Sequence, residues 1–232
     1  MIGPGRSARE QALYAQIHDP ETGVLKNTLG ITTQTNLEIA ERYLIAKRAQ
    51  QGLPDRATQL DIGGLLAIHQ HLFQDVYPWA GQIREYTTGR GPAPFAPPEQ
   101  IAPWLDCQFA TLEQDQFLKD LAAEPFAKRA AEFVNEINAA HPFVEGNGRV
   151  QRTWLRGLAA GAGHRIELRS ADKDQWYEAS RIGFERADRR PMAALIEEAI
   201  ARGRTQDQTP GREKASERRF TRRMGPSKER AR

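Results

Sequence analysis

Apolar residues recur at intervals of three and four positions through most of this chain, and that spacing restricts its fold more than any other feature. Such spacing gathers apolar side chains on one face of an α-helix. It is clearest over Ala57–Asp75 and from about Pro125, a residue suited to a first helical turn, to His141. The same pattern predicts helices over Asn36–Gln51, Pro98–Leu112, Asp172–Ala187 and Pro191–Arg202, and one beginning near Asn147. These seven helices predict a mainly α domain.

Four residues within these helices carry local expectations. Thr35 followed by Glu38 has the spacing of a capping box, which would start the first helix. His69 lies on the apolar stripe of its helix, so we interpret it as a hydrogen-bonded core residue. Cys107 is expected to be a small buried residue.

One segment, Ile83–Phe95, favours strands instead. It contains two adjacent β-branched threonines and two glycines, which predicts an exposed hairpin with a glycine turn. Pro92 and Pro94 would disrupt a central strand, so the hairpin should be an edge or stand alone. Because a free strand edge can pair with an extended protein segment, Glu85–Phe95 is a candidate docking edge. An ordinary surface loop remains the alternative.

The charge distribution divides the chain at about residue 203. Residues 204–232 hold ten Arg and Lys against four Asp and Glu, whereas the whole chain has a net charge of only +3. The body, 1–203, is therefore slightly acidic and forms the predicted domain. The tail has too few apolar residues to offset the entropy of ordering, which predicts a disordered tail or linker. A weak nucleic-acid contact by this tail is a less favoured alternative.

Composition excludes several other classes of protein. The single cysteine excludes a disulfide framework and a cysteine-rich zinc site. The sequence contains no run of about 18 apolar residues, the length needed to span a membrane. The first residues lack the apolar region of a signal peptide. We therefore expect a cytoplasmic protein, although translocation into another cell stays open.

The most informative stretch runs from His141 to Arg152 and reads HPFVEGNGRVQR. A helix should end at His141, because Pro142 disfavours helical backbone in the residue before it. Gly146 and Gly148 allow a tight turn and let bare N–H groups approach a ligand. Since the next helix begins there, its positive dipole end and free N–H groups should form an anion site.

Side chains around this turn suit a polyphosphate. Arg149 and Arg152 share a helix face, and a guanidinium can bind phosphate oxygens through two hydrogen bonds. Glu145 could hold Mg²⁺ beside the phosphates, since Mg²⁺ binds through few carboxylates and keeps most of its waters. His141 is then a candidate general base.

This stretch resembles the signature of the Fic-domain family, HPFx(D/E)GNGRxxR, at every specified position. The resemblance extends to FQDVYPWAGQIR at Phe73–Arg84, to NTLGIT at Asn27–Thr32 and to the helix before the motif, and spans roughly residues 10–202. It implies a Fic-type helical bundle with one exposed β-hairpin flap.

The resemblance also implies an activity, the transfer of AMP from ATP with Mg²⁺ to a Ser, Thr or Tyr hydroxyl of a target protein. By this resemblance His141 is the base, Glu145 the metal ligand and Phe143 a buried anchor of the loop. The implied nucleotide-binding residues are Gly146, Asn147, Gly148, Arg149 and Arg152. The flap residues implied to face the target are Thr87, Thr88, Gly89 and Phe95, and those implied near the adenine are Gln175 and Tyr177.

Regulation is the remaining question. Many family members carry an inhibitory (S/T)xxxE(G/N) helix whose glutamate pairs with the second motif arginine, but no glutamate here has that context. The resemblance then implies the toxin of a toxin–antitoxin pair, inhibited by a separate small antitoxin that supplies this helix and directed at DNA gyrase and topoisomerase IV. A translocated effector with the same chemistry, or a transferase or kinase using another phosphate donor, stays open.

Overall fold

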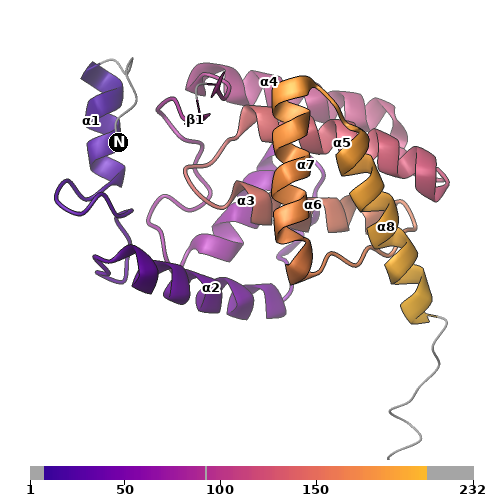
Figure 1. Ribbon diagram of the computed structural model, residues 1–232, viewed down its shortest axis with the longest axis horizontal. Helices are drawn as coiled ribbons and strands as arrows, with labels where there is room; N and C mark the ends of the chain where they lie inside the picture. The colour runs from indigo at the N-terminus through magenta and orange to yellow at the C-terminus, as the bar shows by residue number, and fades with distance from the viewer. Residues whose placement is uncertain (1–7, 92, 208–232) are drawn as a thin grey trace, which may run out of the picture.

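The computed structural model describes residues 8–91 and 93–207, which form a mainly α domain (Figure 1). Short 3₁₀ turns occur at Asp55–Thr58, Gln116–Leu118 and Ser170–Asp172. The helices are α1 (Ala8–Ile17), α2 (Gln34–Gln50), α3 (Ile62–Phe73), α4 (Pro98–Gln114), α5 (Ala123–Ala140), α6 (Asn147–Gly161), α7 (Lys173–Arg186) and α8 (Arg190–Asp207).

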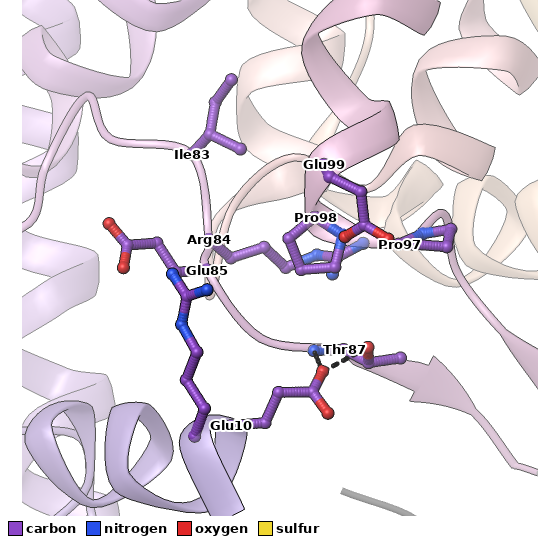
Figure 2. Close-up of a pocket in the computed structure, with 9 residues that line it drawn as sticks. Glu10, Ile83, Arg84, Glu85, Thr87, Pro97, Pro98 and Glu99 are labelled. Carbon is purple, nitrogen blue, oxygen red and sulfur yellow. Dashed lines mark hydrogen bonds between the residues drawn. The ribbon is translucent and has the colours of Figure 1, made fainter. Parts of the chain in front are cut away.

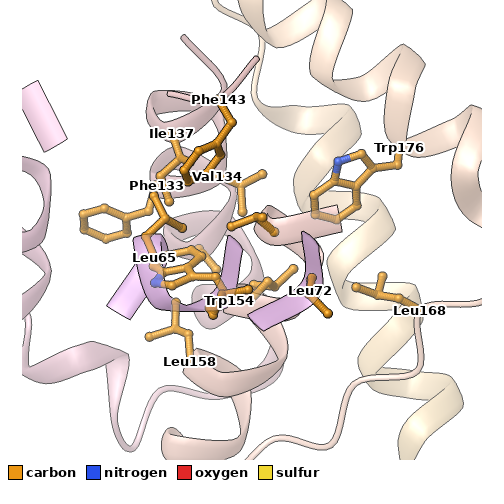
Figure 3. Packing of buried hydrophobic residues seen from close by; sticks show 14 of the residues in the cluster. Leu65, Leu72, Phe133, Val134, Ile137, Phe143, Trp154, Leu158, Leu168 and Trp176 are labelled. Carbon is orange, nitrogen blue, oxygen red and sulfur yellow. The ribbon is translucent and has the colours of Figure 1, made fainter. Parts of the chain in front are cut away.

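Helix α5 is the centre of the bundle, because α4, α6, α7 and α8 all pack against it. Its apolar residues follow the predicted stripe, and Phe126, Phe133 and Ile137 are buried. Figure 3 shows Phe143, from the loop after α5, in the same cluster as Trp154 of α6. The loop between α5 and α6 is therefore fixed to the core at both ends.

The predicted helix over Ala57–Asp75 is a 3₁₀ turn followed by the shorter α3. The break lies at Asp61, whose carboxylate accepts a hydrogen bond from the Gly64 N–H and caps α3. A Cβ on Gly64 would lie only 1.9 Å from the Gln59 carbonyl oxygen, so this close turn requires glycine. Periodicity alone missed the break because the apolar pattern runs across it.

Two further details of the prediction were wrong. Helix α2 begins at Gln34, and Thr33 precedes it without a side-chain cap, so the capping box of Thr35 and Glu38 does not form. Cys107 was expected to be buried, but it lies on the solvent-exposed face of α4. Apolar periodicity also missed α1, a short helix with no buried residue, whose half-buried face holds only three apolar side chains, Leu13, Tyr14 and Ile17.

The hairpin is confirmed as two short antiparallel strands, β1 (Gly89–Arg90) and β2 (Ala93–Pro94), with Gly89 opposite Pro94. The Phe95 N–H donates to the Thr88 carbonyl and extends the pairing. Figure 1 shows α1 on the side of the molecule where the hairpin lies.

At the other end, α8 continues to Asp207, so residues 204–207 of the predicted tail are helical. The predicted disorder of 208–232 concerns residues outside the described part. Within the described residues, no helix has the length and apolar character needed to cross a membrane.

Candidate active site

The loop that joins α5 to α6 begins with a strained histidine. His141 ends α5 in the left-handed region, at φ 44° and ψ 60°. That region is unfavourable for a residue with a Cβ, and such strained residues are enriched at active sites. Pro142 explains why the helix stops there, as the sequence predicted.

Arg84 holds this backbone in place from the base of the hairpin. Its buried guanidinium donates to the carbonyls of Ala140 and His141, at 3.2 and 2.8 Å, and to those of Tyr86 and Ala96. Burial lowers the pKa of Arg84 to about 10, which still leaves the side chain charged at neutral pH. One arginine therefore ties the hairpin to the end of α5.

The His141 imidazole stacks on Phe95, with ring centroids 3.8 Å apart and planes within 3°. Burial, followed by the charges of Arg84 and Arg90, lowers the pKa of His141 to about 3. The ring is therefore neutral at physiological pH and can accept a proton. Its Nδ1 is buried away from solvent, so Nε2 is the ring nitrogen that a substrate hydroxyl could reach.

The loop after His141 is closed by two side chains. Phe143 is buried as predicted. The Asn147 side chain accepts a hydrogen bond from the Phe143 N–H at 3.0 Å and donates one to the Phe143 carbonyl at 2.8 Å. Asn147 therefore contributes to a ligand site only through its backbone. Gly146 adopts φ 88°, and a Cβ there would lie 2.2 Å from Phe73 Cζ. The turn requires glycine for both reasons.

His69 supports the loop from α3. Its Nδ1 accepts from the Gly81 N–H at 2.7 Å, so Nε2 carries the proton and donates to the Glu145 carbonyl at 3.1 Å. The ring stacks on Phe143 and on Phe73, with centroid distances of 4.0 and 4.6 Å. Burial lowers the pKa of His69 to about 3 and keeps it neutral. The interpretation of His69 as a hydrogen-bonded core residue is confirmed.

The first turn of α6 offers free donors. The N–H groups of Asn147 and Gly148 make no hydrogen bond within the described residues, as expected for the start of a helix. The Gly146 N–H instead donates to Glu145 Oε1 at 2.8 Å. The predicted anion site thus has two open N–H groups, while the third is held by the neighbouring carboxylate.

The two motif arginines differ in their surroundings. Arg149 pairs with Glu41 at 2.5 Å and with Glu145 at 2.9 Å. Arg152 makes no ion pair within the described residues and lies over Trp176, 5.7 Å from its ring. Burial, with the nearby charges of Arg156 and Arg149, lowers the pKa of Arg152 to about 10. Arg152 is therefore the cation left uncompensated for an anionic ligand.

The surroundings of Glu145 fit Mg²⁺. Its side chain is 44% exposed, and the described residues contain no cluster of three or more His, Cys, Asp and Glu that could hold a metal. Mg²⁺ is typically bound through one or two carboxylates together with substrate phosphates and water. A single accessible carboxylate beside an anion site suits that mode.

The segment that leads into the hairpin, residues 83–87, faces α1 across a cavity of about 720 Å³ that residues 97–99 also line (Figure 2). Glu10 of α1 points into this space and accepts from the Thr87 N–H at 2.9 Å and its hydroxyl at 2.6 Å. Thr88 faces the partner strand, so Thr87 and Gly89 lie on the free edge. Of the predicted flap residues, Phe95 is instead buried against His141.

The residues expected near the adenine, Gln175 and Tyr177, are exposed on α7. Arg90 of the hairpin lies over the Tyr177 ring at 4.7 Å. The Nη1 atom of Arg90 is buried and has no hydrogen-bond partner among residues 8–91 and 93–207. Hairpin and α7 thus meet beside His141. The adenine contacts of Gln175 and Tyr177 stay predictions.

Sequence reasoning missed Glu41, Arg84 and Glu10. Glu41 and Glu10 lie far along the chain from the residues they contact, as Arg84 does from the end of α5, and no spacing pattern connects them. The only available signal was the presence of Arg84 in the segment that extends the family resemblance.

Comparison with known proteins agrees with this geometry. The sequence profile described as Fic/DOC family matches residues 59–159. "Probable protein adenylyltransferase y4lH" of Sinorhizobium fredii is 39% identical over 78% of this chain and 93% of its own. "Probable protein adenylyltransferase Fic" of Escherichia coli is 32% identical over 71% of this chain and 82% of its own.

Solved structures have the same fold. The crystal structure of BepC, a VirB-translocated effector from Bartonella tribocorum with bound AMPPNP, superposes with a TM-score of 0.72 at 27% identity. The match covers 80% of this chain and 96% of that one. Two Bartonella protein adenylyltransferases match over only 34% and 36% of their own lengths, so they extend well beyond the shared part.

Proposed function

Because this chain belongs to the Fic/DOC family, we propose that it transfers AMP from ATP to a Ser, Thr or Tyr hydroxyl of another protein. It is a protein adenylyltransferase, the activity in the names of the relatives that it matches over most of their length. One observation carries the proposal: a neutral histidine, fixed at the end of α5, stands next to a helix start with open N–H groups.

In the proposed reaction the target hydroxyl oxygen attacks the α-phosphorus of ATP. A bond forms between that oxygen and phosphorus, the bond to the oxygen bridging the α- and β-phosphates breaks, and pyrophosphate leaves. His141 Nε2 takes the hydroxyl proton. Alignment and charge stabilisation are sufficient for such an in-line displacement, so no covalent enzyme intermediate is required.

The phosphates would be bound by the free N–H groups of Asn147 and Gly148 and by Arg152. Arg149 is already committed to two carboxylates, so it would contribute mainly by fixing the loop. Burial, followed by the charges of Arg84 and Arg90, lowers the pKa of His141, and an anionic nucleotide would oppose the effect of these two charges. The pKa of His141 should therefore rise when nucleotide binds, and the imidazole should become a better base.

Glu145 would hold Mg²⁺ against the phosphates. When bound, the cation would neutralise charge on the phosphates and on the departing pyrophosphate. The Glu145 side chain is 44% exposed even though its Oε1 is bonded to Arg149 and the Gly146 N–H, and this exposure beside the anion site supports the assignment.

The target would bind in extended form along the hairpin. Main-chain pairing would fix its register while reading little of its sequence. Gly89 on the free edge supports this, whereas the Thr87 N–H is held by Glu10 and would have to be released. Because Phe95 stacks on His141, a target paired with this edge would be positioned relative to the base.

We further propose that the protein acts in the cytoplasm as the toxin of a toxin–antitoxin pair, restrained by a separate antitoxin. DNA gyrase and topoisomerase IV are the proposed targets, by family resemblance. The lack of an (S/T)xxxE(G/N) segment, and of an ion pair to Arg152 in the described residues, supports inhibition from outside. The resemblance to BepC, named a translocated effector, favours the second candidate, an effector with the same chemistry.

The test is incubation of the full chain and bacterial lysate with α-³²P-ATP or γ-³²P-ATP. Label transferred only from the α position, with an AMP-sized increase in intact mass, supports the proposal, while label from the γ position would indicate a kinase. His141→Ala should lose about 10²–10⁴-fold in rate and still bind ATP, while His71→Ala serves as a matched control. A wild-type chain that becomes active only after an internal glutamate is replaced would contradict inhibition by a separate antitoxin.

A further inference from the structure

Glu41 is a buried acidic residue of α2 that faces the loop between α5 and α6 from outside the motif. Its Oε1 pairs with Arg149 Nη1 at 2.5 Å. Its Oε2 accepts from the Tyr77 hydroxyl at 2.5 Å. Both carboxylate oxygens therefore have defined partners.

Arg149 connects Glu41 to Glu145. While Nη1 is held by Glu41, Nη2 donates to Glu145 Oε1 at 2.9 Å. The guanidinium also lies over the Phe73 ring, 4.9 Å from its centroid. The guanidinium is thus fixed between a buried carboxylate and an accessible one.

We propose that Glu41 is a positioning residue for the metal-holding carboxylate. It fixes Arg149 so that one guanidinium nitrogen orients Glu145, and its negative charge offsets that of Arg149. Glu145 is then oriented without being neutralised, and it keeps its affinity for a divalent cation. The inference rests on the proposed function, since it concerns the same site.

Two observations support a role beyond packing. A buried carboxylate is costly unless it is paired and hydrogen-bonded, so its placement here requires both Arg149 and Tyr77. Burial and the Glu41 carboxylate raise the pKa of Tyr77 well above its ordinary value, so the hydroxyl stays protonated and continues to donate. Glu41 also lies outside residues 59–159, the segment matched by the family profile, so α2 adds this contact to the motif.

The test is Glu41→Gln in the full chain, because glutamine keeps the shape and removes the charge. Mn²⁺ affinity is measured by electron paramagnetic resonance in the presence of AMPPNP, and thermal unfolding is measured in parallel. Outer residues that orient a metal ligand typically affect metal affinity by 10–100-fold, so we expect Mn²⁺ to bind about 10-fold more weakly. The Mg²⁺ concentration for half-maximal AMP transfer should rise by about the same factor.

Two variants serve as controls. Glu38 lies one turn earlier on α2, where it is exposed and accepts a hydrogen bond from Gln34, so Glu38→Gln should leave Mn²⁺ affinity unchanged. Glu41→Asp keeps the charge but shortens the side chain, so it should recover part of the lost affinity.

The inference is overturned if Glu41→Gln folds normally and binds Mn²⁺ as tightly as wild type. It is also overturned if the variant binds metal more tightly or transfers AMP faster, because Glu41 would then restrain the site. Should Glu41→Gln not fold, an unchanged Mn²⁺ affinity in Glu41→Asp would overturn it. Because Mn²⁺ binding with AMPPNP needs no target, a wild type that binds both but transfers no AMP would refute only the proposed function.

Discussion

Replacing His69 with phenylalanine tests whether the active-site loop depends on a neutral core histidine. The imidazole receives the Gly81 N–H and donates to the Glu145 carbonyl, and its ring stacks on Phe143. Phenylalanine preserves an aromatic ring of similar size in a position with no solvent exposure. The substitution therefore removes two hydrogen bonds while creating little cavity.

The expected loss of stability follows from the two backbone groups that lose their partner. Leaving a buried polar group unsatisfied costs about 1–3 kcal/mol. Each of the two hydrogen bonds is only partly buried, so each loss should fall below the upper limit. We expect a combined loss of about 2–4 kcal/mol in the free energy of unfolding. The loop should also become less ordered, so AMP transfer should slow and the nucleotide should bind more weakly.

The assay is urea unfolding of the full chain at pH 7, combined with AMPPNP binding. His164→Phe is a matched control, because His164 is also buried and its imidazole bonds to the Leu121 carbonyl, away from the loop. That variant should lose about 1–3 kcal/mol and bind AMPPNP normally.

The reasoning would be refuted if His69→Phe matched wild type in both stability and nucleotide affinity. It would also fail if the two phenylalanine variants weakened AMPPNP binding equally, because the effect would then be general destabilisation rather than loss of support for Glu145.

Two further predictions concern pH and backbone shape. His69 and His141 have folded-state pKa values of about 3, below the ordinary 6.5, so between these values the unfolded chain binds more protons than the native one. Stability should therefore fall as pH decreases from about 6.5 towards 3, by about 1.4 kcal/mol per pH unit for each histidine, and a His69→Phe chain should show a shallower slope in urea unfolding. Gly146→Ala should lose about 2–5 kcal/mol, since it combines a left-handed backbone with a 2.2 Å approach to Phe73. In contrast, Gly157 lies inside α6, and a Cβ there would meet no described atom within 4 Å, so Gly157→Ala should gain about 0.5–1 kcal/mol. Equal effects of the two substitutions would contradict the steric argument.

Short-range chemistry explains what the sequence determined. The apolar stripes defined most helices, and Pro142 next to His141 ended α5 in the expected place. Gly146 marked the turn, and the hairpin followed from its threonines and glycines. These features depend on neighbours within a few residues, so they can be inferred from spacing and backbone preference.

Tertiary structure decided which of the predicted groups are available for a ligand. Arg149 and Arg152 have equivalent places in the motif, but only Arg149 meets Glu41 from α2. In the same way, the Asn147 side chain is used to close the loop, and Phe95 stacks on His141 instead of facing solvent. These contacts join segments far apart in the chain, and no local rule reports how such segments pack. The sequence therefore identified the chemical groups of the site, whereas packing determined which of them remain free to act.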